Sequence, residues 1–126
     1  MTYFVKPNGN GNGMTIEQAG EFTEIVKNLL SGDILYLLGG IYNYDKQITL
    51  DLKGEPNKEI LIIADDKENL PIFDFRYQPY GNKSNSDCNG IRIFGEYAHV
   101  DGLIVRYSGY KGIRSELSNS ILENIE

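Results

Sequence analysis

The tripeptide Gly90-Ile91-Arg92 returns as Gly112-Ile113-Arg114, so that each of its positions recurs 22 further along the chain. The strand-like segment 99–105 is followed in a similar way, with a step of 21, by segment 120–126. A fixed period in the low twenties is typical of solenoids, in which each repeat adds one unit to a continuous core. The repeat therefore excludes most compact folds and leaves the kind of solenoid as the main question.

The segments between turns are short and apolar, which indicates strands. Alternating or continuous apolar residues predict strands at 3–5, 33–38, 41–44, 47–52, 59–64 and 71–75. Without intervening helices these strands cannot form a doubly wound α/β sheet. Hairpins throughout remain an alternative, but the 22-residue interval favours an all-β fold, the right-handed parallel β-helix. In that fold Arg92 would stack on Arg114, and Ile91 on Ile113.

One segment has the pattern of an amphipathic helix. Thr15 and Gln18 have the spacing of a capping box, and Ser31-Gly32 supplies a stop. The apolar residues that fall on one face between them are Ile16, Ala19, Phe22, Ile25, Val26, Leu29 and Leu30. We predict an N-terminal capping α-helix that plugs the open end of the solenoid, where a first coil would otherwise expose strand edges and its apolar interior.

The organisation that follows is a single domain, 1–126. Residues 1–32 form the N-terminal cap and residues 33–126 the first coils of the β-helix, and we expect the chain to be truncated at its C-terminus. Asn and Gly alternate at 8–13, which predicts a tight turn. A phosphate-binding loop is disfavoured there, because the lysine and hydroxyl of such a loop are missing at the required offsets. Residues 78–89 are polar and predict a surface loop.

Charge and composition limit the classes of partner that the protein can bind. The net charge of −6 argues against nucleic acid, because neutralising phosphates requires a cationic face. No run approaches the roughly 18 apolar residues of a membrane span, so no membrane partner is expected. Segment 1–5 lacks the sections of a signal peptide, so either the protein stays inside the cell or a leader has been removed. Cys88 is the single cysteine, which excludes an intrachain disulfide.

The order of several segments resembles a known family. The segments that carry the likeness are 3–10, 31–42, 48–50, 60–64, 71–75, 95–103 and 118–124. Together they resemble the N-terminal portion of bacterial right-handed β-helix pectate lyases, most closely polysaccharide lyase family 9. The Gly-Asp-strand-Gly-Gly-x-Tyr pattern at 32–42 is shared by many β-helix lyases, whereas 73–75 and 107–112 lean toward family 9.

The resemblance implies a calcium-dependent lyase that is secreted or displayed at the cell surface and acts on pectate, an acidic plant-type polysaccharide. In this family a lysine abstracts the proton next to the uronate carboxylate, and clustered aspartates hold the calcium. Both lie on later coils, beyond the region matched up to Glu126, so no catalytic and no metal-binding residue is assigned here. The resemblance makes this chain the first quarter or third of an enzyme.

The candidate substrate-binding residues are basic. Arg92 and Arg114, with Arg106 and Lys111 between them, are the one basic concentration in an acidic chain. Such a strip would suit uronate carboxylates, because the guanidinium fork matches a carboxylate. Ordinary ion pairing with Glu96 or Glu116 is the favoured alternative, worth about 0–1 kcal/mol per pair. Tyrosines at 97, 107 and 110 could also stack on sugar rings.

Other polar residues have simpler explanations. Asp65-Asp66 is predicted to lie in a solvated turn, since a calcium site needs six to eight converging oxygens. Asp51, Asp74 and Asp101 would converge only if they stacked, which the spacing does not show. His99, the only histidine, is predicted to be a solvent-facing polar residue.

Two classes of function stay open. One is the N-terminal part of a pectate lyase that cleaves polygalacturonate by β-elimination, the chain itself lacking the catalytic coils. The other is a non-catalytic β-helix for glycan binding or adhesion. A lyase for another polyuronate is a third possibility, because fold does not fix substrate.

Overall fold

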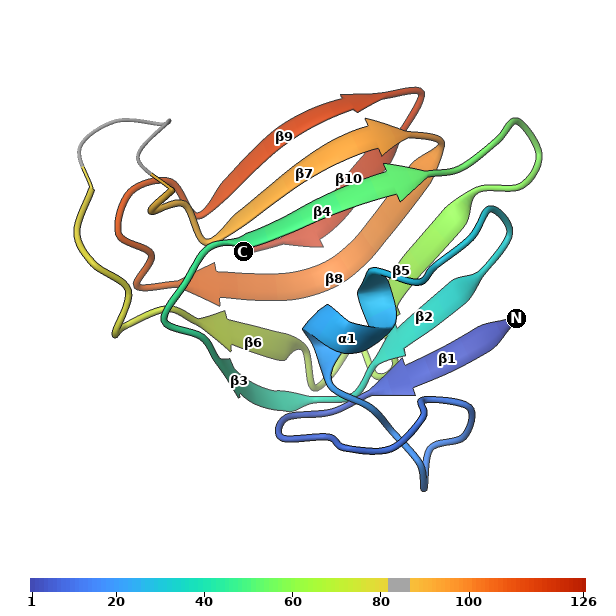
Figure 1. Cartoon of the computed structure of the whole chain (residues 1–126), viewed down its shortest axis with the longest axis horizontal. Coiled ribbons are helices and arrows are strands. Elements are labelled where there is room, and N and C mark those ends of the chain that lie inside the picture. The colour runs from blue at the N-terminus through green and yellow to red at the C-terminus, as the bar shows by residue number, and fades with distance from the viewer. Residues whose placement is uncertain (82–86) are drawn as a thin grey trace.

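The chain folds into parallel strands wound around one apolar interior (Figure 1). The computed structural model describes residues 1–81 and 87–126. Every pairing between the named strands of this described part is parallel. The predicted parallel β-helix is thereby confirmed. Residues 82–86 of the predicted surface loop lie outside the described residues, and the flanking positions 78–81 and 87–89 carry no strand.

Three strand layers surround the interior. The first contains β1 (Thr2–Val5), β2 (Ile34–Leu37), β5 (Ile60–Ala64), the first part of β8 (Ala98–Arg106) and β10 (Ile121–Ile125). The second contains β3 (Gly40–Asn43), β6 (Pro71–Asp74) and the end of β8. The third contains β4 (Ile48–Lys53), β7 (Ile91–Glu96) and β9 (Ile113–Ser118). Strand β8 therefore turns a corner between two layers.

The repeat sets the stacking register. Ile91 pairs with Ile113 and Arg92 with Arg114, as the recurring tripeptide predicts. The shorter interval predicted for the next segment is wrong by one position, because His99 pairs with Ile121 rather than with Ser120. Since a slip of one residue moves every side chain to the other face, burial decides the register. Leu122 stacks on the buried Val100 and packs against the core, whereas Ile121 is 48% exposed.

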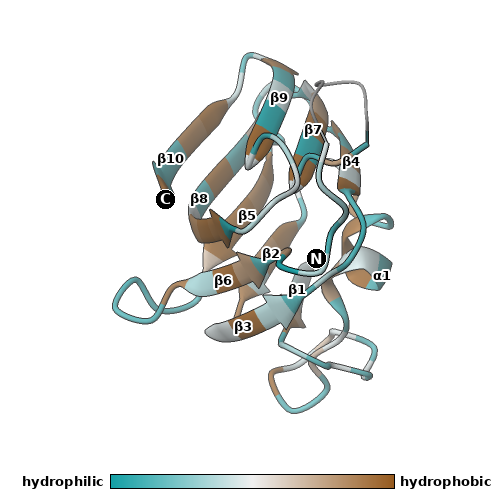
Figure 2. Cartoon of the chain, turned by 90° about the vertical axis from the view of Figure 1, so that its left-hand side faces the viewer, coloured by the Kyte–Doolittle hydropathy of each residue, from teal (hydrophilic) through white to brown (hydrophobic). Residues whose placement is uncertain are grey.

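Hydropathy follows the same alternation (Figure 2). Strand β4 alternates buried and exposed residues along its whole length. Apolar and polar residues alternate along several of the strands in this view, as expected for strands with one buried face. The interior is thus a continuous core, and polar side chains of stacked coils form ladders on the outside.

The predicted capping helix is much shorter than its pattern indicated. Helix α1 spans Phe22–Val26, with Glu21 as N-cap; its carboxylate accepts a hydrogen bond from the backbone N–H of Glu24. Thr15 Oγ1 does accept from the N–H of Gln18, but within an isolated turn. Leu30 is 72% exposed, so it does not extend the buried face.

Backbone contacts with β1 explain the shortened helix. Segment 13–20 returns alongside β1: Phe4 N–H donates to the carbonyl of Gly13, and Gly20 N–H donates to the carbonyl of Phe4. The turn at Gly11 packs closely against this returning segment, since a Cβ on Gly11 would lie 2.1 Å from the carbonyl oxygen of Gln18. These hydrogen bonds use backbone groups that a helix would need, and the helix begins only where the chain leaves β1.

The short helix still covers the end of the core. Phe22 and Val26 belong to the buried cluster. The ring of Phe22 lies edge-on to that of Phe73 at 4.9 Å, and the ring of Tyr42 stacks on Phe73 at 4.8 Å. Aromatic contacts therefore join the cap to the first coils.

Candidate functional site

A buried carboxylate organises two arginines at the end of the second layer. Asp74 closes β6 and pairs in register with Arg106, the last residue of β8. Its side chain is 1% exposed and accepts hydrogen bonds from Arg76 Nε at 3.2 Å and from Arg76 Nη2 at 3.0 Å. Arg106 Nε lies 3.5 Å from Asp74 Oδ2. One acidic group thus holds two cationic ones.

The electrostatics favour the ionised carboxylate. Burial alone would raise the pKa of Asp74, but the hydrogen bonds and charge of Arg76, with the charge of Arg106, hold that pKa below its usual value. Two guanidinium groups against one carboxylate leave one positive charge at this place. The side chains of Arg76 and Arg106 are 49% and 37% exposed, so part of each guanidinium faces solvent.

An exposed tyrosine completes this surface. The ring centre of Tyr107 lies 4.9 Å from Arg76 Cζ and 5.6 Å from Arg106 Cζ, and the residue is 61% exposed. We call Arg76, Arg106 and Tyr107 the arginine–tyrosine patch. Two loops support it, because Gly109 N–H donates to Gln78 Oε1 at 2.7 Å. The patch combines charged forks with an aromatic ring, the groups that suit a negatively charged sugar.

The predicted basic strip divides into two groups. Arg92 and Arg114 stack on the third layer and share Glu116, whose Oε1 lies 3.3 Å from Arg92 Nη2 and 3.2 Å from Arg114 Nη2. Arg106 lies at the end of the second layer, beside Asp74. Lys111 is exposed in the loop between β8 and β9. Of the four predicted residues, Arg92 and Arg114 therefore pair with Glu116, whereas Arg106 pairs with Asp74 on another layer.

Sequence reasoning missed Asp74 and Arg76 as parts of this site. The separation of Asp74 from Arg106 does not match the 22-residue interval, because β6 pairs with the far end of the bent strand β8. The local spacing of Asp74 and Arg76 was the one available signal, since residues two apart can be linked by an Asx-type turn. Arg76 N–H indeed donates to Asp74 Oδ1 at 2.9 Å.

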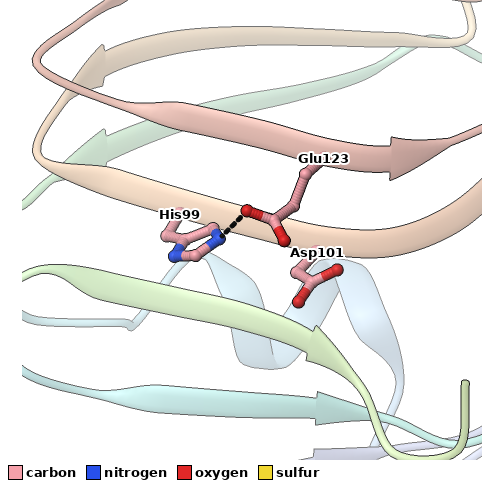
Figure 3. A group of neighbouring side chains, drawn as sticks. All are labelled: His99, Asp101 and Glu123. Carbon is pink, nitrogen blue, oxygen red and sulfur yellow. Dashed lines mark hydrogen bonds and ion pairs between the residues drawn. The ribbon is translucent and has the colours of Figure 1, made fainter.

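A second polar group lies on the outer face of the first layer (Figure 3). His99 and Asp101 come from β8 and Glu123 from β10. His99 Nε2 lies 3.0 Å from Glu123 Oε2, and the His99 side chain is 25% exposed. The prediction of a polar residue near solvent thus describes His99, but it missed the two acidic neighbours. The interval of the recurring tripeptide, applied to Asp101, would have found Glu123.

A calcium site does not fit the aspartates described here. Asp51 lies near Lys53, Asp74 is held by two arginines, and Asp101 pairs with Lys67. Asp65 and Asp66 lie in an exposed turn. Calcium takes six to eight oxygen ligands, and within residues 1–81 and 87–126 these aspartates do not converge. No residue of this part is assigned to calcium.

Comparisons with known proteins agree with this architecture. A family model described as "Pel9A-like, right handed beta helix region" matches residues 3–126. Pectate lyase L of Paenibacillus polymyxa (strain SC2) is 31% identical over an alignment 126 positions long, which covers 98% of this chain and 27% of that protein. The crystal structure of pectate lyase Pel9A superposes with a TM-score of 0.84 at 25% identity, covering 98% of this chain and 32% of that one.

More distant likenesses concern the fold alone. A rhamnogalacturonan lyase matches with a TM-score of 0.68 at 19% identity, over 82% of this chain and 28% of that one. The structure of an alginate lyase of the PL6 family, AlyGC, matches with a TM-score of 0.58 at 17% identity, over 99% of this chain and 15% of that one. The chain spans a third or less of the length of each of these relatives. In the described part of the chain, no helix is long and apolar enough to cross a membrane.

Proposed function

The chain belongs to the Pel9A-like right-handed β-helix family, and from this premise we propose that it forms the first coils of a calcium-dependent pectate lyase that cleaves polygalacturonate by β-elimination. The match over residues 3–126 carries this proposal. The relative named pectate lyase L, 31% identical, and the solved pectate lyase Pel9A support the substrate class. A secreted or cell-surface location follows from the same proposal, because pectate is an extracellular polymer.

We assign the chemical step to residues outside this chain. Elimination needs a base near the α-carbon of the uronate and a cation beside its carboxylate. In the described residues, Asp51, Asp74 and Asp101 are dispersed and held by separate cationic partners. The role of this chain is then to cap the core, through α1, and to present a surface to the polysaccharide.

The arginine–tyrosine patch is our proposed uronate contact. Its guanidinium groups are prepositioned by the buried Asp74, so little side-chain freedom is lost when a carboxylate binds. Tyr107 offers an apolar ring face next to them. Arg92, Arg114 and Lys111 remain a second candidate surface, although Glu116 already compensates part of the charge of the two arginines.

A non-catalytic glycan-binding or adhesion module is the alternative function. The observation that favours it is that the arginine–tyrosine patch is complete within this chain. A lyase for another polyuronate stays possible as well, because one fold supports several substrates.

An elimination assay tests the main proposal. Two proteins are each incubated with polygalacturonate and calcium: residues 1–126, and the protein encoded by the whole reading frame that contains them. The unsaturated reaction product is followed by its ultraviolet absorbance. We expect the protein encoded by the whole reading frame to form unsaturated product, and residues 1–126 to form none. Binding without cleavage by both proteins would favour the alternative, and cleavage by residues 1–126 would contradict our placement of the chemistry.

A titration with trigalacturonate tests the proposed contact. Tyr107→Ser changes an exposed ring, and Arg76→Gln removes the charge of a half-exposed side chain while Arg106 stays beside the buried Asp74; circular dichroism checks the fold of each variant. We expect each to weaken binding about 5- to 30-fold, the range for loss of one charge-assisted hydrogen bond or one stacking contact. Arg114→Gln is the matched control on the other basic surface. If only Arg114→Gln weakens trigalacturonate binding, the uronate contact lies on the stacked Arg92 and Arg114 instead.

A further inference from the structure

We propose that His99, Asp101 and Glu123 form a binding site for a divalent transition-metal ion of the zinc class on the outer face of the coils. The three side chains converge from two stacked strands (Figure 3). This site is independent of the proposed lyase function, because it depends only on the pairing of β8 with β10.

The strand register brings the ligands together. Asp101 and Glu123 are direct partners in the parallel pairing, so their side chains leave the sheet side by side. His99 stands two residues before Asp101 on β8 and therefore points to the same face. One ligand atom from each residue lies within 4.8 Å of the others. Ligands about 2.0–2.1 Å from a tetrahedral zinc ion lie about 3.4 Å apart, so small rotations of the three side chains close the site.

The donor set selects the kind of metal. One imidazole nitrogen with two carboxylate oxygens suits zinc and its neighbours in the first transition row. Calcium prefers an all-oxygen shell of six to eight ligands, which this group does not supply. Three protein ligands leave a position open for water. A hollow of 550 Å³ beside Asp101 and Glu123, lined also by Lys67, Leu70 and Asn124, leaves room for it.

Two neighbouring side chains contact the carboxylate of Asp101. Asn124 Nδ2 donates to its Oδ1 at 2.7 Å, and Lys67 Nζ lies 2.5 Å from its Oδ2. A neutral outer partner such as Asn124 fixes the direction of a ligand and tunes its affinity. Lys67 also places a positive charge beside the site, which opposes cation binding. Removing that charge should therefore strengthen metal binding, an effect that a plain His99–Glu123 ion pair does not predict.

Metal binding would join two coils. Because the ligands come from both β8 and β10, a bound ion would hold the outer strand of the pair to its neighbour. Ligands that bind only the folded state raise its stability by mass action. We thus expect zinc to raise the thermal midpoint of the chain, a readout that requires no enzymatic activity.

Calorimetric titration of residues 1–126 with zinc chloride tests the site, in protein without an affinity tag. A Cys88→Ser background removes the single cysteine as a competing ligand. Since His99 is the only histidine, the nitrogen-15 shift of its imidazole reports metal binding at one position. We expect one zinc ion per chain, a large shift of Nε2, and no matching response to calcium chloride.

Three variants locate the site. Glu123→Gln should weaken zinc binding about 10-fold or more, and Lys67→Gln should tighten it several-fold. Glu96→Gln, an exposed acid at the end of β7, is the control and should change nothing. Far-ultraviolet circular dichroism confirms the fold of each; Lys67 is 45% exposed, so its replacement is safe even where Glu123→Gln unfolds. Absence of saturable binding, an unmoved His99 signal, or no tightening by Lys67→Gln would overturn the proposal.

Discussion

Replacing Phe73 with leucine should weaken the contact between the cap and the first coils. Phe73 is fully buried, and its ring centre lies 4.9 Å from Phe22 and 4.8 Å from Tyr42. Leucine keeps most of the apolar volume but loses these two close ring pairs, each worth about 0.5–1.5 kcal/mol beyond burial, and a wider stacked pair with Tyr44 at 6.2 Å. The expected loss in the free energy of unfolding is thus about 1–3 kcal/mol, against about 3–5 kcal/mol for Phe73→Ala.

Urea unfolding followed by far-ultraviolet circular dichroism measures this loss. Phe94→Leu is the matched control, because Phe94 is half-buried and its ring contacts the guanidinium of Arg92 at 4.4 Å on the outer face. Its expected cost is about 0.5–1 kcal/mol, the value of an exposed cation–π contact. Equal costs for the two leucine variants would refute the conclusion that the aromatic cluster joins α1 to the coils.

Three further outcomes follow from single residues. Asp74→Asn should lower stability at neutral pH and make stability fall less steeply in acid. A carboxyl whose pKa is depressed in the folded state contributes stability above about pH 4 and loses that contribution as pH falls through the folded pKa. Urea titrations across pH measure this, and an unchanged fall of stability in acid would contradict it. Leu30→Gln should change stability by less than about 0.5 kcal/mol, since Leu30 is 72% exposed. A larger loss in the same titration would support the longer helix predicted from the sequence. Tyr42→Phe should cost about 1–3 kcal/mol, because the hydroxyl lies 2.6 Å from the Leu38 carbonyl, which loses this donor, whereas the Val5 carbonyl also accepts from the N–H of Leu38 at 3.0 Å. A neutral effect in urea would show that the Leu38 carbonyl finds another partner.

The strands were predictable because burial on one face leaves a periodic pattern. Segment 47–52 alternates cleanly, and β4 occupies Ile48–Lys53 with the same alternation. The stacking of Arg92 on Arg114 was equally accessible, since a repeated tripeptide directly states which residues are equivalent. Local pattern and repeat interval thus contain most of the information that a solenoid needs.

The helix was mispredicted because its pattern is not unique to a helix. Apolar residues at 16–30 fit a helical face, but segment 13–20 finds backbone partners on the preceding strand β1. Tertiary hydrogen bonds of this kind override local propensity. Glycines at positions 9 and 11 were local signs of such a close approach, because a Cβ there would lie 2.1 Å from the carbonyl oxygens of Gly20 and Gln18 respectively.

The polar groups were only partly predictable. Asp74 and Arg106 meet because β8 bends between two layers, and no fixed interval connects them. Asp101 and Glu123 meet through the 22-residue register, but an interval shorter by one places Leu122 opposite Asp101. A displacement of one residue was sufficient to hide the cluster, since it exchanges the inner and outer faces of a strand.

The 22-residue register underlies the stacked coils and the His99–Asp101–Glu123 group, and paired cysteines test it directly. In a Cys88→Ser background, His99→Cys with Ile121→Cys places two thiols on register partners, at a spacing compatible with a disulfide. His99→Cys with Ser120→Cys tests the alternative register, shorter by one. We predict rapid disulfide formation in the first pair and slow or no formation in the second, measured by mass spectrometry after mild oxidation. Preferential formation in the second pair would contradict the stacking of β10 on β8.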